Sequence, residues 1–368
     1  MGNNKSKKKE TRSRVIKKII DISLALIIAG GAVYAVRTVT NDFSDINRTA
    51  EKDDSAVVTS ETVKPDENAI IYVTEVMDNE IMNSGSLIVV NGQTEYKGKG
   101  DNLVSVYDVL QADGTDSYMV MDADVKLKRD AATALNDMVK AFAAETGKKH
   151  IIVDGGYRSV DYQQELYDAA EDKSAAAKPG FSDYHTGFSI DLGISAEDGT
   201  MEDFTGSGDY SWFKENCSKY GFVVRFPEGK KDVTGYDYRP WHFRYVGVPH
   251  AYYMQTNNLC LEEYVDKLKN FEYTQTHLVF KNDAGNEYEV YYYPVDPSGS
   301  QTIVAVPNSE YQVSGNNKDG FIVSFKMNKQ PAATENTEVS DSLTDEKSEA
   351  ETKSSETETT PTSKLAEE

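Results

Sequence analysis

The sequence predicts an α+β fold, with an apolar segment before it and a small all-β unit after it. Residues 125–146 place apolar side chains on one helical face. A short apolar run at 150–153 follows, as expected for a helix that leads into a buried strand. From residue 276 the pattern changes to alternation of polar and apolar side chains, which indicates strands. Residues 19–36 form an apolar run that follows a basic segment. These patterns define the domain organisation.

The apolar run at 19–36 is long enough to span a bilayer as a helix. The basic flank before it predicts a cytoplasmic N-terminus and a main domain on the outer side. A cleaved signal peptide that ends near Val33-Tyr34-Ala35 is the alternative. We therefore expect a basic cytoplasmic segment at 1–18, a transmembrane anchor at 19–36, a polar stalk at 37–68, the main α+β domain at 69–270, a small β domain at 271–328 and a disordered acidic tail at 329–368.

Charge and cysteine content exclude some classes of protein. The 368 residues carry a formal net charge of −22, and the body of the chain offers no basic surface for a nucleic acid. The two cysteines, Cys217 and Cys260, allow at most one disulfide. Cys217 follows Trp212 and Phe213 at helical spacing, which favours a buried thiol over a bridge.

Local patterns predict the other elements of the folded part. Gly147 and Gly221 follow two of the expected helices as stop signals. Tyr291, Tyr292 and Tyr293 are more typical of a strand than of a sugar-stacking face. Further helices are expected at 161–170, 210–220 and 261–270, and further strands at 70–73, 86–90, 222–226, 277–280, 288–293, 302–306 and 321–325.

Two short runs carry the residue types of a metal site. The first, at 182–191, contains His185 and Asp191, and the second, at 238–247, contains His242. Imidazole and carboxylate groups form the ligand set of a zinc site with one position left open for water. Either histidine alone is more often an ordinary polar residue, so the prediction depends on the residues around them.

Those surrounding residues occur in the order of a known family. The chain resembles the VanY-type D-alanyl-D-alanine carboxypeptidases, which are zinc peptidases that trim peptidoglycan stem peptides outside the bacterial membrane. The resemblance covers about residues 85–270 and implies a small α+β domain with the zinc site on a central antiparallel sheet. The motifs are Tyr157-Arg158-Ser159, Gln164 with Leu166-Tyr167, Pro179-Gly180-Phe181-Ser182, Thr186-Gly187, Asp191-Leu192, Tyr220-Gly221-Phe222, Arg225-Phe226-Pro227 and the run from Pro240 to Gly247.

The resemblance assigns roles residue by residue. Asp191 and His242 match two positions that bind Zn²⁺, and Arg158 matches the arginine that contacts substrate or the developing oxyanion. Gln164, Ser182 and Trp241 lie in matching motifs and are expected to contact substrate. Tyr184 stands where the family has its first histidine ligand, and Arg239 stands where it has the glutamate that acts as general base.

Both differences bear on the expected chemistry. A tyrosine must lose a proton near pKa 10 before it binds zinc well, and an arginine cannot accept a proton. We expect the guanidinium of Arg239 to bind Asp191 in place of the metal. The alternative is that His185, one residue beyond Tyr184, serves as the third ligand.

Three functions follow from these expectations. The preferred one is a membrane-anchored, non-catalytic relative that binds peptidoglycan stem peptides or a cell-wall protein partner. The second is an active zinc carboxypeptidase that uses His185, Asp191 and His242. The third is an extracytoplasmic interaction module that acts through the C-terminal β unit.

Overall fold

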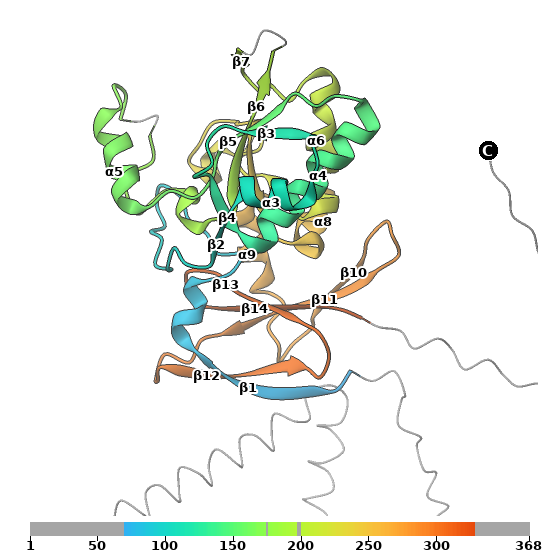
Figure 1. Ribbon diagram of the computed structural model, residues 1–368. Helices are drawn as coiled ribbons and strands as arrows, with labels where there is room; N and C mark the ends of the chain where they lie inside the picture. Colours follow the sequence, from blue (N-terminus) through green and yellow to red (C-terminus); the bar gives the residue numbers. More distant parts are fainter. Residues whose placement is uncertain (1–69, 174–175, 197–199, 328–368) are drawn as a thin grey trace, which may run out of the picture. The chain divides into compact units, whose positions relative to one another are not determined.

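A computed structural model describes residues 70–173, 176–196 and 200–327 (Figure 1). The expected segments 1–18, 19–36, 37–68 and 329–368 lie outside these residues. Within the described ranges, no helix combines the length and the apolar character needed to cross a membrane.

A mixed sheet forms the centre of the main domain. Its strand order is β3-β5-β6-β9-β8, and β7 pairs with β6 beside this path. The β3–β5 pair is parallel and the other pairs are antiparallel, so the expected antiparallel sheet carries one parallel edge. The strands are β3 (Tyr118–Val120), β5 (Ile151–Gly155), β6 (Ser189–Ser195), β7 (Met201–Glu202), β8 (Phe222–Val224) and β9 (His242–Tyr245).

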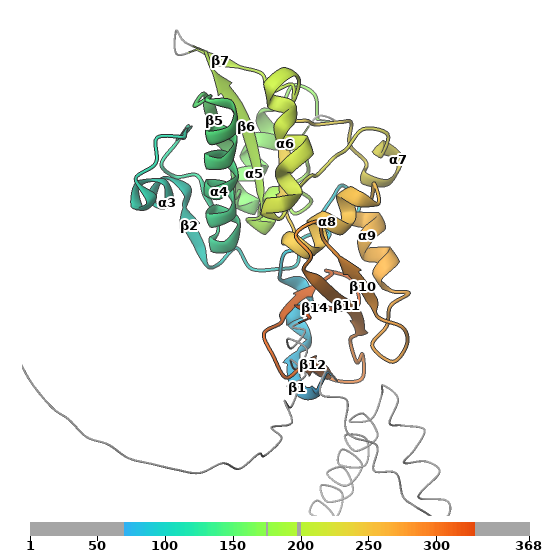
Figure 2. The same ribbon diagram turned by 90° about the vertical axis from the view of Figure 1, so that its right-hand side faces the viewer.

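Helix α4 (Arg129–Thr146) packs its apolar face onto this sheet (Figures 1 and 2). Phe142 of α4 contacts Phe213 of α6 (Ser211–Asn216), with ring centroids 4.6 Å apart. Gly147 ends α4 in the left-handed conformation, as predicted. The residues before the helix form β4 (Lys126–Lys128), which pairs with β2 (Leu103–Ser105), so the helix begins later than its pattern indicated.

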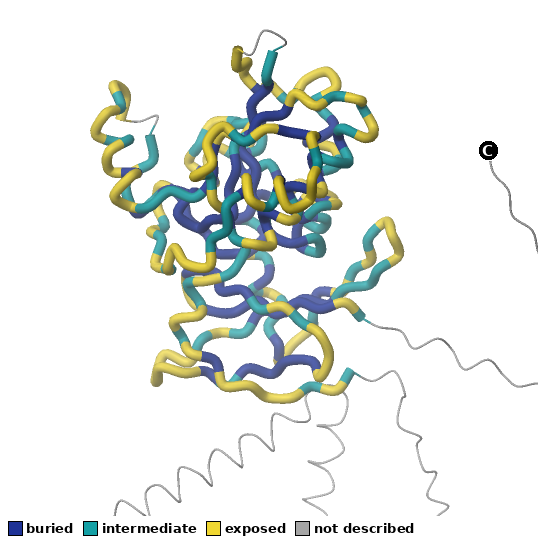
Figure 3. The backbone as a smooth tube through the Cα atoms, in the orientation of Figure 1, coloured by how far each residue is buried: buried dark blue, intermediate teal, exposed yellow. Residues whose placement is uncertain are grey.

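Shorter elements complete the main domain. The expected helix at 210–220 is divided into α6 and the 3₁₀ turn η4 (Cys217–Tyr220), and both cysteines of the chain are buried free thiols. The other elements of the main domain are α3 (Val106–Asp113), α5 (Val160–Ala169), η2 (Asp183–Thr186), η3 (Gly208–Tyr210), α7 (Lys231–Thr234), α8 (Val248–Thr256) and α9 (Leu261–Leu268). The 3₁₀ turn η1 (Asn79–Asn83) packs instead with the C-terminal β unit. Figure 3 shows that the buried backbone follows the strands of the central sheet.

The C-terminal residues form a separate antiparallel sheet. Its order is β10-β11-β14-β13, built from β10 (Leu278–Lys281), β11 (Glu287–Pro294), β14 (Gly320–Lys326) and β13 (Gln312–Gly315). Strand β12 (Gln301–Pro307) pairs instead with β1 (Tyr72–Asp78). The first strand of the range expected for the main domain therefore belongs to the core of the β unit. Tyr291 and Tyr292 are buried, as strand formers rather than as a sugar-stacking face.

The expected strand at 86–90 is wrong. These residues are buried or partly buried but form no strand. Their backbone carbonyls accept hydrogen bonds from two arginines: Ser86 and Ile88 from Nη2 of Arg244 at 3.0 and 2.9 Å, and Val90 from Nη2 of Arg225 at 3.2 Å. The apolar pattern therefore reports burial, because arginine side chains replace the neighbouring strand as hydrogen-bond partners.

His277, a partly buried histidine of the β unit, lies between two hydrogen-bond acceptors. Nδ1 of His277 contacts the carboxylate of Glu289, and Nε2 lies 2.8 Å from the carbonyl oxygen of Tyr273. Both partners are acceptors, so both ring nitrogens must carry a proton. Burial opposes this charge, but the hydrogen bonds to Glu289 and Tyr273 outweigh burial and raise the pKa of His277.

We expect His277→Gln to destabilise the protein by about 1.5–3 kcal/mol below pH 6.5 and by less at higher pH. A raised folded-state pKa gives stability that is complete below the unfolded pKa and is lost as pH rises through the folded value. Urea unfolding of both proteins between pH 5 and 9 tests this. A difference that stays constant across that range would contradict it.

Candidate functional site

The site is built on the register between β6 and β9. Asp191 and His242 are directly paired across these two strands, which brings their side chains together. Nδ1 of His242 donates to Oδ1 of Asp191 at 2.7 Å. The structure therefore brings these two predicted ligand residues together.

Tyr184 is the third member of this cluster. It lies on the 3₁₀ turn η2, and Gly187 ends that turn with a φ of 72°. This is the bend that returns the chain to β6, and it requires glycine. The Tyr184 hydroxyl donates to Oδ2 of Asp191 and lies 3.0 Å from Nδ1 of His242. Burial and the neighbouring Asp191 carboxylate raise the pKa of Tyr184 well above 10, so the side chain is a neutral phenol.

The Asp191 carboxylate is charged although it is mostly buried. Burial raises its pKa, but His242 and the Tyr184 hydroxyl outweigh burial and hold the pKa below its usual value. Gly155 of β5 lies opposite Asp191. A side chain at Gly155 would place its Cβ 3.2 Å from the Cβ of Asp191, so glycine leaves the room that this carboxylate occupies.

Asp183 forms a second buried centre behind the first. Its Oδ1 accepts from Nη1 of Arg244 at 2.5 Å and from Nε of Arg225 at 3.2 Å, and its Oδ2 accepts from the Ser189 hydroxyl. Burial alone would raise the pKa of Asp183, but the two guanidinium groups hold it well below its usual range. Nε2 of His242 lies 3.5 Å from Oδ2 of Asp183 and meets no hydrogen-bond partner of closer geometry among the described residues.

The charged network extends to α9. Arg225 makes two hydrogen bonds to Glu262, of 2.9 and 2.6 Å, and Asn91 donates to the same carboxylate at 2.9 Å. Sequence analysis missed this network. Its only signal was the occurrence of arginine within the apolar runs of β8 and β9, where a buried cation needs a buried anion.

His185 is not part of the cluster. Its Nδ1 donates to the backbone carbonyl of Arg158 at 2.7 Å, and its Nε2 accepts from the backbone N–H of Gly180 at 3.0 Å. Burial lowers its pKa, which agrees with one donor and one acceptor on a neutral ring. His185 thus connects two loops, and the structure does not bring it together with Asp191 and His242.

The two arginines of the site lie against aromatic rings. The guanidinium carbon of Arg158 is 3.7 Å from the ring centroid of Tyr184. That of Arg239 is 4.8 Å from Tyr236 and 5.5 Å from Phe226. The expected pairing of Arg239 with Asp191 is not the arrangement found, because Tyr184 and His242 already occupy both oxygens of that carboxylate.

The other predicted substrate contacts differ in exposure. Ser182 is buried, and its hydroxyl has no hydrogen-bond partner in the described part of the chain, whereas Trp241 is 38% exposed. Gln164 is exposed on α5, but the adjacent Gln163 is buried. Gln163 donates to the carbonyl of Ala177 at 2.8 Å, and no residue that the structure describes bonds its Oε1. Gln163 is therefore the glutamine that the fold turns inward.

The residues of this cluster do not fit a zinc ion. Within residues 70–173, 176–196 and 200–327, no group of three or more His, Cys, Asp or Glu side chains is arranged to hold a metal. Asp191 and His242 supply two metal-binding groups, but the third place is taken by a neutral phenol whose hydroxyl donates a hydrogen bond to Asp191. A zinc site requires three protein ligands that can accept the metal.

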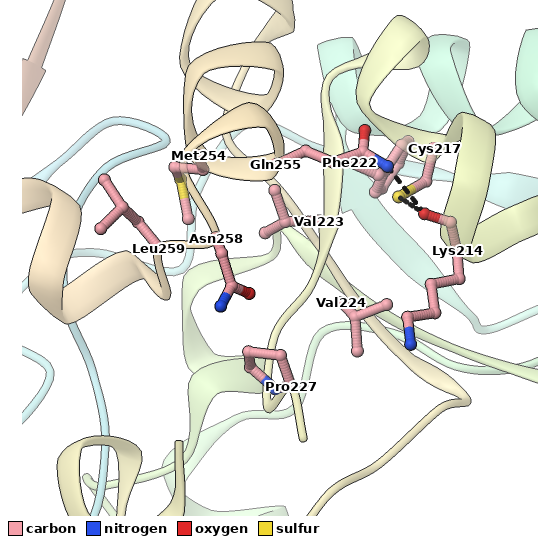
Figure 4. A pocket seen from close by; sticks show the side chains of 10 residues that line it. All are labelled: Lys214, Cys217, Phe222, Val223, Val224, Pro227, Met254, Gln255, Asn258 and Leu259. Carbon is pink, nitrogen blue, oxygen red and sulfur yellow. Dashed lines mark hydrogen bonds between the residues drawn. The ribbon is translucent and has the colours of Figure 1, made fainter. Parts of the chain in front are cut away.

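A separate hollow lies between α6, β8 and α8 (Figure 4). Apolar side chains including Val223, Met254 and Leu259 line it, with Lys214 and Asn258 among the polar ones. None of the predicted site residues lines it, so its position gives no support to the predicted chemistry.

The site is thus a mixed sheet on which an aspartate and a histidine are paired across adjacent antiparallel strands. The family model for VanY, D-alanyl-D-alanine carboxypeptidase, matches residues 124–248. A D-alanyl-D-alanine carboxypeptidase of Enterococcus faecium is 35% identical over 244 residues, which cover 65% of this chain and 74% of that protein. The chain belongs to the VanY D-alanyl-D-alanine carboxypeptidase family, whose members act on peptidoglycan.

A further curated relative and two solved structures are also similar to this chain. The bifunctional D-Ala-D-Ala dipeptidase and carboxypeptidase VanXYC of Enterococcus gallinarum is 35% identical over 157 residues, which cover 40% of this chain and 81% of that protein. The crystal structure of the D,D-dipeptidase VanXYg with a D-Ala-D-Ala phosphinate analogue aligns with a TM-score of 0.59 at 29% identity, covering 70% of this chain and 99% of that chain. A VanY D,D-pentapeptidase has been solved with Zn(II); it covers 49% of this chain and 98% of that chain at 29% identity and a TM-score of 0.40.

Proposed function

We propose that this protein is a non-catalytic member of its family that binds peptidoglycan stem peptides without cleaving them. The observation that carries the proposal is the hydroxyl of Tyr184, which bonds Asp191 and lies 3.0 Å from His242. In the family resemblance this is the place of the first histidine ligand. A buried phenol at that place satisfies Asp191 without a metal.

The residue at the general-base position, Arg239, also supports the proposed loss of catalysis. In the family resemblance its position belongs to the glutamate that activates water, and an arginine cannot accept a proton. Loss of a general base alone lowers a rate by about 10²–10⁴-fold. The structure gives no support to the alternative in which His185 replaces the missing ligand, because backbone groups occupy both of its nitrogens.

The proposal also concerns where in the cell the protein is located. The apolar run at 19–36 follows a basic segment, and we propose that it anchors the protein with the folded part on the outer face of the membrane. Stem peptides of the wall are then within reach of the site around Asp191 and His242. A protease added to intact cells or spheroplasts should degrade the folded part if this topology is right, and protection of that part would contradict it.

The experiment that tests the lost chemistry is a zinc measurement on the purified full-length protein. We expect far less than one zinc per chain after incubation with zinc and removal of unbound metal. We also expect no release of D-alanine from a peptide that ends in D-Ala-D-Ala. Near-stoichiometric zinc together with chelator-sensitive release of D-alanine would establish an active peptidase instead.

A further inference from the structure

We propose that the C-terminal β unit acts on the site around Asp191 and His242 through one residue, Asn317. Asn317 lies in the turn between β13 and β14 and fixes residues 92–100, which we call the strap. It is a positioning residue, because it reaches the site only through other residues. The inference rests on the proposed function for the ligand, a stem peptide, and adds a role for a part of the chain that the family resemblance does not cover.

The side chain of Asn317 bonds the segment that leads into the strap. It is buried, with 1% of its surface exposed, and its amide nitrogen donates to the backbone carbonyls of Val89 at 2.9 Å and Glu95 at 2.7 Å. The backbone N–H of Asn317 donates to the carbonyl of Met82 at 2.8 Å. An asparagine amide has two N–H donors, and both are used on this one segment. Asn317 therefore joins the β unit to the chain at both ends of the stretch from Val89 to Glu95.

These bonds account for the asparagine better than the turn itself does. Asn317 has a φ of 63°, a left-handed conformation that glycine adopts with less strain. The turn is closed by Asn316, whose Oδ1 accepts from the backbone N–H groups of Lys318, Asp319 and Gly320. No described residue bonds Oδ1 of Asn317, and burying an acceptor without a partner costs stability. What the Asn317 side chain contributes is thus its two donors.

The strap contacts the site next to His185. The backbone N–H of Tyr96 donates to the carbonyl of Gly180 at 2.8 Å, and the N–H of Gly180 donates to Nε2 of His185 at 3.0 Å. The rings of Tyr96 and His185 lie 5.9 Å apart. His185 bonds the carbonyl of Arg158, whose guanidinium lies over Tyr184. A continuous series of hydrogen bonds therefore runs from the strap to the loop that carries Arg158.

Both ends of the strap also lie against tyrosines at the border of the site. The backbone of Gly100 packs so closely on Tyr157 that a Cβ at this position would lie 2.1 Å from the Tyr157 hydroxyl oxygen. A Cβ at Gly92 would lie 3.9 Å from the hydroxyl oxygen of Tyr236, whose ring contacts Arg239. The strap thus touches the chain beside each of the two arginines of the site.

The strap needs these contacts to keep one conformation. Its residues form no helix and no strand, and Gly92, Gly98 and Gly100 give its backbone additional freedom. Ordering such a segment costs conformational entropy. Because Asn317 orders the strap before a ligand arrives, binding does not bear this entropy loss. We therefore expect the affinity for a stem peptide to depend on the amide of Asn317.

Hydrogen exchange of the full-length protein, followed by mass spectrometry, tests the positioning step. Asn317→Gly keeps the left-handed backbone and removes the amide side chain. Residues 92–100 and 178–186 should then exchange about tenfold faster than in the wild type, because two hydrogen bonds are lost. Asn258→Gly is the matched control, since Asn258 is exposed, has a φ of 52° and follows α8. It should leave exchange in both segments unchanged.

A second control lowers the stability of the β unit at another place. Oγ1 of Thr302 on β12 donates to Asn79 at 2.7 Å and accepts from the backbone N–H of Asp296 at 2.8 Å. Thr302→Val removes both bonds and should lower the melting temperature without raising exchange in the strap. General loss of stability is thereby separated from release of the strap.

Isothermal titration calorimetry with a peptide that ends in D-Ala-D-Ala tests the consequence for binding. Asn317→Gly should bind the peptide about tenfold more weakly than the wild type, because binding must now order the strap. Asn258→Gly and Thr302→Val should bind it like the wild type. The coupling is reciprocal, so saturating peptide should slow exchange of residues 316–319 in the wild-type protein. This last measurement needs no variant to fold.

The outcomes separate this inference from the proposed function. Wild-type exchange in the strap of Asn317→Gly, or an equal rise in Thr302→Val, overturns the role of Asn317. Unchanged peptide binding by Asn317→Gly, or unchanged exchange of residues 316–319 in the peptide-bound wild type, overturns the connection between the β unit and the site. If the wild type binds no peptide, the proposed function fails, and exchange of residues 178–186 still decides whether Asn317 acts on the site.

Discussion

The double variant Tyr184→His with Arg239→Glu is expected to bind one zinc ion per chain and to release D-alanine from a peptide ending in D-Ala-D-Ala. The reason is geometric. Tyr184 already lies 3.0 Å from Nδ1 of His242 and donates to Asp191, so an imidazole here joins the two donors that the β6–β9 register brings together. Three ligands with one open position are what a catalytic zinc requires.

The two single variants separate the contribution of zinc binding from that of the general base. Tyr184→His alone should bind zinc and turn over slowly, because Arg239 still stands in place of a proton acceptor. Adding Arg239→Glu should then raise the rate by about 10²–10⁴-fold, the usual contribution of a general base. Arg239→Glu alone should bind no zinc.

Tyr184→Phe is the matched control for this series. It removes the hydroxyl without adding a donor for a metal, so it should bind no more zinc than the wild type. Zinc content by elemental analysis and D-alanine release with and without a chelator measure the series. Stoichiometric zinc in Tyr184→Phe would show that Tyr184 does not decide metal binding, and an inactive, metal-free double variant would show that further parts of the site have been lost.

Sequence patterns predicted the parts of the fold that depend on local order. Helix α4 and its stop at Gly147 follow from periodicity and from the conformational freedom of glycine. The family resemblance implied that Asp191 and His242 lie close together, but no local pattern fixes which strands pair, so the β6–β9 register was not predicted. Pairing of β1 with β12 was missed for the same reason, since its partners are far apart in the chain.

Side-chain partners were the least predictable part of the site. A buried Asp191 carboxylate requires a hydrogen-bond partner. Arg239 was the expected partner because of its positive charge. The structure supplies His242 and the Tyr184 hydroxyl instead, because the turn η2 and Gly187 bring the phenol to that carboxylate. Gln163 rather than Gln164 points inward because a helix presents adjacent residues to different directions.

Asp183 is the residue whose loss should cost the most stability. Its carboxylate is buried and accepts from Arg225, Arg244 and Ser189. Asp183→Asn keeps the shape but removes the only charge, among the contacts described, that Arg244 pairs with directly. Removing one partner of a buried ion pair leaves an uncompensated charge and costs about 3–5 kcal/mol.

Urea unfolding of the wild type and of Asp183→Asn measures this loss, and Asp237→Asn provides the comparison. Asp237 pairs with Lys231 at 2.8 Å, but the side chain of Asp237 is 80% exposed, and pairs of this kind contribute about 1 kcal/mol or less.

The depressed pKa of Asp183 also determines how its contribution to stability changes with pH. Its contribution is complete above the unfolded pKa of about 3.9 and declines only as pH falls below that value. Suppose that Asp183→Asn and Asp237→Asn lower the free energy of unfolding by similar, small amounts. The Asp183 ion-pair network would then not be what stabilises the contact between β9 and the 86–90 segment.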